Sequence, residues 1–89
     1  MVTSIILVNV KRDKVNEVAE QLADMPGISE VYSVTGNYDL VAIVRVNTNE
    51  ELAELVTSEL VKIDGIVKTD TMLAFKAYSK HDLEAMFVI

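Results

Sequence analysis

Apolar residues along the chain follow two different spacings, and each spacing predicts a kind of element. Runs of β-branched and apolar residues predict strands, whereas apolar residues at steps of three and four predict helices that bury one side. The patterns follow one another as strand, helix, strand, strand, helix, strand. The predicted strands cover residues 4–10, 28–35, 38–46 and 66–78, and the predicted helices cover residues 14–24 and 49–62.

The chain consists of two similar halves, offset by 38 residues. The Gly27-Ile28 pair of the first half falls on Gly65-Ile66 of the second. The other matching pairs are Ile5 and Ile43, Val8 and Val46, Asn9 and Asn47, Val18 and Val56, and Leu22 and Leu60. Two strand–helix–strand units predict an α+β fold in which two helices cover one face of an antiparallel sheet. The other face is bare and apolar, and we expect another copy of the chain to cover it.

Turn and capping residues mark the boundaries between these elements. Asp13 is the expected N-cap of the first helix, and Pro26-Gly27 ends that helix. Gly36-Asn37 predicts a two-residue hairpin, because both residues tolerate a positive φ. Residues 48–51, Thr-Asn-Glu-Glu, match the capping box of the second helix, which Asp64-Gly65 ends.

Composition and charge narrow the functional classes. The 89 residues predict one domain spanning 1–89, and a hydrophobic content of 51% favours self-association. The net charge of −6 argues against binding to nucleic acid, because phosphate contacts need clustered Lys and Arg. The chain has no cysteine, which excludes disulfides and thiolate chemistry. No apolar stretch is long enough for a signal peptide or a membrane span, so we expect a cytoplasmic protein.

Few residues suit catalysis or metal binding. The one histidine, His81, precedes Asp82 and has no second ligand at metal-binding spacing. The second predicted helix carries acidic residues on its outward side, as is typical of a solubilising surface: Glu50, Glu51, Glu54 and Glu59. Paired carboxylates for acid–base chemistry would face a cavity instead. We therefore expect no enzyme activity, no metal and no cofactor.

Two neutral polar motifs remain. The loop Gly36-Asn37-Tyr38-Asp39 runs directly into an apolar strand, and Thr69 and Thr71 share one face of the last strand because strand side chains alternate. In a structural interpretation, the loop forms a hairpin turn in which Tyr38 covers the edge of the core and Asp39 caps a backbone N–H. The threonines are then present only because threonine favours β-strands. In a functional interpretation, loop amides and threonine hydroxyls receive a carboxylate while Asp39 receives an ammonium group.

Three short motifs resemble the effector-binding domain of the Lrp/AsnC family of amino-acid-responsive regulators, also called the RAM domain. They are Gly36-Asn37-Tyr38-Asp39-Leu40, Ile63-Asp64-Gly65-Ile66 and Thr69-Asp70-Thr71. The resemblance implies a ferredoxin-like sandwich of the dimeric α+β barrel type, whose dimers associate into rings of eight or ten. It also implies that a free amino acid binds between dimers. The residues that match its binding site are Gly36, Asn37, Tyr38, Asp39, Thr69 and Thr71.

The family's usual chain begins with a helix-turn-helix domain, which has no counterpart before the first predicted strand here. The resemblance therefore implies a stand-alone form without direct DNA binding, whose partners are further copies and full-length relatives. Two other functions stay open: a dimeric α+β barrel enzyme of the monooxygenase kind, and an interaction module without a ligand. In the tail, we expect residues 79–82 to cap a short helix. We expect the apolar C-terminal residues 87–89 to form an extra edge strand or to contact a neighbouring subunit.

Overall fold

The strands and helices follow the predicted order. The computed structural model describes residues 1–78, so the predictions for the tail and for His81 fall outside the described part of the chain. The strands are β1 (Val2–Val10), β2 (Ile28–Ser33), β3 (Leu40–Val46) and β4 (Ile66–Leu73). The helices are α1 (Val15–Ala23), after a 3-10 turn (Arg12–Lys14), and α2 (Asn49–Glu54), which continues as a π-helical segment (Leu55–Glu59) and a 3-10 turn (Leu60–Lys62).

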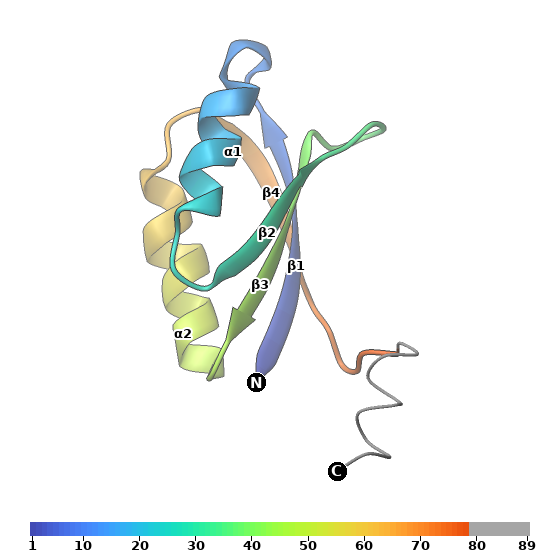
Figure 1. Cartoon of the computed structure of the whole chain (residues 1–89). Coiled ribbons are helices and arrows are strands. Elements are labelled where there is room, and N and C mark those ends of the chain that lie inside the picture. Colours follow the sequence, from blue (N-terminus) through green and yellow to red (C-terminus); the bar gives the residue numbers. More distant parts are fainter. Residues whose placement is uncertain (79–89) are drawn as a thin grey trace.

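The four strands form one antiparallel sheet in the order β2-β3-β1-β4. In the central pair, Ile5 of β1 lies opposite Ile43 of β3, and these two residues are equivalent in the sequence repeat. The two halves of the chain are therefore related by an approximate twofold axis between these isoleucines. Figure 1 shows α1 and α2 on one side of the sheet, and residues 1–78 place no helix on the other side. The predicted ferredoxin-like α+β sandwich is confirmed.

The core lies between the helices and the sheet. Alternate residues of the two central strands point into it, as the pleat of a strand requires. The buried strand residues are Ser4, Ile6, Val8, Val10, Ile28, Leu40, Ala42, Val44 and Val46, and the buried helix residues are Val18, Leu22, Leu55 and Leu60. Ser4 is the buried polar residue, and its hydroxyl donates to the Met72 carbonyl at 2.7 Å. This bond satisfies the hydroxyl inside an otherwise apolar layer.

The repeated Gly-Ile pairs lie where the chain passes from each helix into the next strand of the sheet. Gly27 has a φ of +96° and Gly65 a φ of +105°. A Cβ on Gly27 would lie 3.2 Å from Leu55 Cδ1, and a Cβ on Gly65 would lie 3.1 Å from Val18 Cγ2. Each glycine therefore lets the end of its own half pack closely against the helix of the other half, in a backbone conformation that favours glycine.

The two helices begin differently. Thr48 Oγ1 accepts a hydrogen bond from the Glu51 N–H at 3.1 Å, which confirms the predicted capping box. The return bond differs from the standard box, because Glu51 Oε2 accepts from the N–H of Asn47, one residue earlier. The prediction of Asp13 as an N-cap was wrong. Asp13 lies inside the 3-10 turn, and α1 starts at Val15 without a side-chain cap.

The last strand is shorter than predicted. β4 ends at Leu73, not at Tyr78, and one further ladder bond joins the Ala74 N–H to the Thr3 carbonyl. Among the described residues, β4 is an edge strand that pairs only with β1. β1 continues for two residues beyond Ser4, the partner of Leu73, so the start of the neighbouring strand does not set the end of β4. Within residues 1–78, the structure has no helix long and apolar enough to cross a bilayer.

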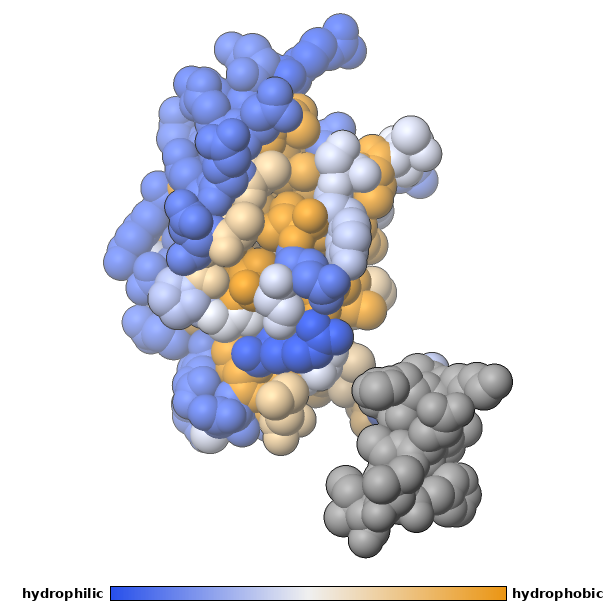
Figure 2. All heavy atoms as spheres, viewed as in Figure 1, coloured by the Kyte–Doolittle hydropathy of each residue, from blue (hydrophilic) through white to orange (hydrophobic). Residues whose placement is uncertain are grey.

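The sheet face without helices, here called the bare face, has an apolar centre. Cross-strand pairing places its residues in two rows, Glu30–Ile43–Ile5–Met72 and Tyr32–Val41–Leu7–Asp70. Tyr32 and Met72 are 50% and 46% exposed, and the aliphatic residues between them are only partly buried. Figure 2 shows hydrophilic residues over the helices and hydrophobic residues reaching the surface along the sheet.

Candidate functional site

The loop between β2 and β3 is longer than the predicted two-residue hairpin. β2 ends at Ser33 and β3 begins at Leu40, and the Val34 N–H donates to the Asp39 carbonyl at 3.0 Å. Gly36 has a φ of +106°, whereas Asn37 does not have a positive φ. The prediction was wrong because a two-residue turn of this type needs a positive φ at both positions. Figure 1 shows this loop projecting from the side of the sheet opposite the helices.

Asp39 ties the loop to the end of β1. Its Oδ2 accepts a hydrogen bond from the Val10 N–H at 2.8 Å, and its own N–H donates to the Val8 carbonyl at 2.9 Å. The Asp39 side chain is only partly exposed. This is the backbone-capping role that the structural interpretation of the loop gives to Asp39.

Two further contacts hold the loop against the bare face. Asn9 Nδ2 donates to the Asn37 carbonyl at 2.8 Å, and the Tyr38 hydroxyl donates to Asp70 Oδ2. Asn9 and Asp70 both point to the bare face, since they alternate along β1 and β4 with residues of the helix side. The hydrogen bond to Asp70 raises the pKa of Tyr38 above its ordinary value, because losing the phenolic proton would lose that bond.

Thr69 and Thr71 point in the opposite direction. They pair with Val8 and Ile6, which are fully buried on the helix side, whereas Asp70 between them pairs with Leu7 on the bare face. The prediction that the two threonines share one face is confirmed. That face is the helix side of the sheet.

A pocket opens beside Thr69, between the end of the second helix and β4. Its volume is about 280 Å³. Its lining consists of Val56, Leu60, Val61, Ile63, Ile66, Val67 and Thr69. Two of the lining residues are large exposed hydrophobic residues, Val61 at 71% and Val67 at 65%. Thr71 lies one pleat farther along β4 on the same side.

The predicted site residues therefore form two separate groups within one chain. The loop residues Asn37 and Tyr38 contact the bare face, whereas Thr69 and Thr71 lie on the helix side. The sheet itself separates the two groups.

Sequence reasoning missed Asn9 and Asp70 as partners of the loop. Asp70 lies within the Thr69-Asp70-Thr71 motif, and strand alternation alone places it on the other face from its neighbours. The alternation of strand side chains does not predict the path of the loop. That path brings Tyr38 into contact with Asp70, which is 32 residues later in the sequence.

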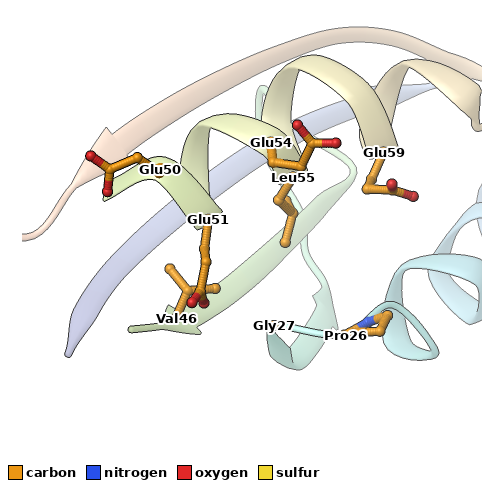
Figure 3. A pocket seen from close by; sticks show the side chains of 8 residues that line it. All are labelled: Pro26, Gly27, Val46, Glu50, Glu51, Glu54, Leu55 and Glu59. Carbon is orange, nitrogen blue, oxygen red and sulfur yellow. The ribbon is translucent and has the colours of Figure 1, made fainter. Parts of the chain in front are cut away.

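The acidic residues of the second helix border a groove. Pro26, Gly27, Val46 and Leu55 line it together with Glu50, Glu51, Glu54 and Glu59, and its volume is about 420 Å³. Figure 3 shows the glutamates along the helix, across from the turn at Pro26 and Gly27. Glu51 is used in the capping box, and Glu59 lies 3.5 Å from Lys62 Nζ in an ion pair. Within residues 1–78, no group of three His, Cys, Asp or Glu residues is placed to hold a metal ion.

The chain is similar to several proteins of known sequence or structure. FL11, an HTH-type transcriptional regulator of Pyrococcus horikoshii, is 42% identical over 76 residues, which are 84% of this chain and 49% of FL11. This chain thus spans about half the length of the curated relatives it matches. TTHA0845 of Thermus thermophilus has a solved structure with a TM-score of 0.84 and 42% identity, covering 90% of this chain and 100% of that one.

A more distant likeness concerns the fold alone. The transcriptional regulator NMB0573 of Neisseria meningitidis, solved as a complex with L-Met, has a TM-score of 0.79 at 15% identity, covering 88% of this chain and 52% of that one.

The family model described as the Lrp/AsnC ligand binding domain matches residues 3–83. With that match over most of its length, the chain belongs to the Lrp/AsnC family of ligand-binding domains.

Proposed function

We propose that this protein binds a free amino acid at a site shared between copies of the chain, and that binding controls its assembly. The observation that carries the proposal is the division of the site residues. Thr69 and Thr71 lie on the helix side of β4, whereas the 36–39 loop leans over the bare face. One chain alone does not assemble both groups around a ligand, but two chains do.

The chemistry of the two groups suits the two charged ends of an amino acid. Threonine hydroxyls donate hydrogen bonds to a carboxylate, and the N–H groups around Gly36 add further donors. Asp39 of the neighbouring copy takes the ammonium group with Oδ1, since its Oδ2 already accepts from Val10. Support from the family comes from the N. meningitidis regulator of the same fold, which was solved with L-Met.

The bare face provides the first step of assembly. Its central residues Ile5, Leu7, Val41 and Ile43 form an apolar patch at the middle of the sheet. A second copy covers this patch and removes it from water, at roughly 25 cal/mol per Å² of apolar surface buried. Charged residues lie at its border, where Arg45 Nη1 is 3.3 Å from Glu30 Oε1. We propose dimers through this face, and rings of eight or ten chains built from these dimers.

The role of such an assembly is regulatory. Curated relatives of this chain are named transcriptional regulators, which favours a regulatory domain over an enzyme. A ligand that binds only between copies stabilises the assembled form by mass action. We propose that the protein acts in the cytoplasm. It would affect transcription by forming mixed assemblies with full-length relatives.

Calorimetric titration of the purified protein with each of the twenty amino acids tests this function. Light scattering on the same samples reports the mass of the assembly. The proposal predicts binding of at least one amino acid below millimolar concentration, together with a change in mass or in its concentration dependence. A monomer at micromolar concentration that binds none of the twenty contradicts it.

A further inference from the structure

We propose that the second helix packs against the sheet in two alternative registers, and that an amino acid bound beside Thr69 holds it in the register that the structure shows. This proposal rests on the proposed function and adds a conformational response to it. Its starting point is the π-helical segment Leu55–Glu59 in the middle of that helix. The Leu60 N–H donates to the Leu55 carbonyl, five residues earlier, so this turn is wider than an α-helical turn.

Comparison of the two halves of the chain shows that the wide turn shifts the helix by one residue. In the repeat, Val18 of the first helix matches Val56 of the second, and Leu22 matches Leu60 in the same way. Val18 and Leu22 are both fully buried, four residues apart in an α-helix. In the second helix, the residue buried together with Leu60 is Leu55, whereas Val56 is only partly buried.

The glycines that follow the two helices show the same shift. A Cβ on Gly65 would lie 3.1 Å from Val18 Cγ2. Gly27 is the equivalent of Gly65, so the repeat predicts Val56 as its neighbour. A Cβ on Gly27 would instead lie 3.2 Å from Leu55 Cδ1. Leu55 therefore occupies the place in the core that the first half gives to a valine.

The wide turn is what brings Leu55 into this place. Successive residues of an α-helix are about 100° apart, so residues four apart differ in direction by about 40° and residues five apart by about 140°. Leu55 and Leu60 are five apart, and they share the buried side only because the turn between them is wide. In a regular α-helix, Val56 would lie four residues before Leu60 and would replace Leu55 in the core.

The two registers compete for one place in the core. The side chains of Leu55 and Val56 differ by one methylene, and the burial of that methylene favours Leu55 by only about fourfold. A change of register also moves the residues before the turn, by about 100° around the helix axis and about 1.5 Å along it. Those residues include Glu54, which lines the acidic groove together with Leu55.

The pocket beside Thr69 exists in the register with the wide turn. Val56 lines this pocket, and in the other register its side chain would leave the pocket wall for the core. A ligand seated against Val56 therefore favours the wide turn, because only that register offers it this contact. Occupancy of the pocket then also fixes the shape of the acidic groove, since one helix lines both.

NMR contacts to Gly27 test the two registers in the protein without ligand. In the wild type, nuclear Overhauser effects should join the Gly27 α-protons to the methyl groups of Leu55. Leu55→Ala removes the larger competitor, so the contact should pass to the methyl groups of Val56. Leu52→Ala changes a partly buried residue of the same helix and serves as the matched control, which should keep the Leu55 contact. Thermal unfolding shows whether both variants are folded.

Calorimetric titration with each of the twenty amino acids tests the link to binding. Leu55→Ala should weaken the tightest binding about tenfold, because the register that binds becomes the minor one. Val56→Thr adds a hydroxyl without changing the shape of the side chain, and this hydroxyl opposes entry into the core. The double variant Leu55→Ala/Val56→Thr should therefore bind as tightly as Val56→Thr alone. Simple damage to the helix by Leu55→Ala would instead weaken binding in both backgrounds.

The outcomes separate this proposal from the proposed function. If Val56 does not replace residue 55 beside Gly27 in folded Leu55→Ala, the second register does not exist. If the double variant binds about tenfold more weakly than Val56→Thr, the register does not control binding, and amino-acid sensing stands without it. If none of the twenty amino acids binds to the wild type, the proposed function and the role of the ligand fail together, and the Gly27 contacts alone decide whether the helix has two registers.

Discussion

Asp39 Oδ2 accepts a hydrogen bond from the backbone N–H of Val10 at 2.8 Å, and this bond fixes the base of the β2–β3 loop to the end of β1. The same carboxylate has a second oxygen, Oδ1, which the proposed function assigns to the ammonium group of the effector. A structural role and a binding role therefore meet in one side chain. They can be separated, because a backbone N–H requires only an acceptor, whereas an ammonium group is bound best by a negative charge.

Substitutions of Asp39 test this separation. Asp39→Ala removes the acceptor from a partly buried N–H and should lower the free energy of unfolding by about 1–3 kcal/mol. Asp39→Asn keeps an oxygen acceptor for Val10 and should cost less than about 1 kcal/mol. Both variants should lose amino-acid binding. Urea denaturation measures the stability and calorimetry the binding; an Asn variant that binds as tightly as the wild type would show that Asp39 is structural only.

Two glycines with nearly the same φ give a test of close packing between the halves. Gly36, at +106°, has open space around it, whereas a Cβ on Gly65, at +105°, would lie 2.9 Å from Lys14 Cβ. Gly36→Ala should lower the free energy of unfolding by about 1–2 kcal/mol, through backbone strain alone. Gly65→Ala should lower it by about 1–3 kcal/mol more, because the new methyl group overpacks against α1. Equal losses of unfolding free energy for the two variants would refute the close approach at Gly65.

Tyr38 should titrate at a higher pH than a free tyrosine. Its hydrogen bond to Asp70 raises its pKa above the ordinary value of 10.0, because the bond stabilises the protonated phenol. The stability gained from this bond is complete below the pKa of the unfolded chain and is lost as pH rises through the folded pKa. Asp70→Asn should bring the pKa of Tyr38 back towards 10.0.

Tyr32 is the internal control for this titration. Its pKa is also raised, chiefly by its hydrogen bond to Glu30, and Asp70 has no part in that shift. Carbon-13 NMR of the two tyrosine rings across alkaline pH follows both groups in one sample. A Tyr38 pKa that stays unchanged in Asp70→Asn while Tyr32 behaves as expected would contradict the Tyr38–Asp70 contact.

The hydrophobic pattern and the repeat were sufficient to predict the sheet, the helices and the bare face. Ile5 and Ile43 match in the sequence repeat and lie opposite each other in the sheet. The elements that carry such positions follow from the spacing of apolar residues, which the sequence shows directly. The capping contact between Thr48 and Glu51 was predictable because a capping box involves only residues that are neighbours in the sequence.

Features that depend on distant partners were not predictable in this way. The length of the β2–β3 loop depends on Asp39 reaching Val10 and Val8, which are about thirty residues earlier. The end of β4 at Leu73 was not predictable from the β-propensity of residues 74–78. For the site, the residue types were predicted, but their division between two faces depends on register, which needs the structure.

The most direct test of a site shared between copies uses two variants that are each defective. The double variant Thr69→Val/Thr71→Val keeps an intact loop, and Asp39→Asn keeps intact threonines. Each variant alone should fail to bind the amino acid that the wild type binds. When the two are co-expressed and purified as mixed assemblies, random association places intact threonines of one chain against an intact loop of another at about a quarter of the sites. Calorimetry should therefore recover about a quarter of the wild-type binding capacity; mixed assemblies that bind nothing, although they contain both chains, would contradict the shared site.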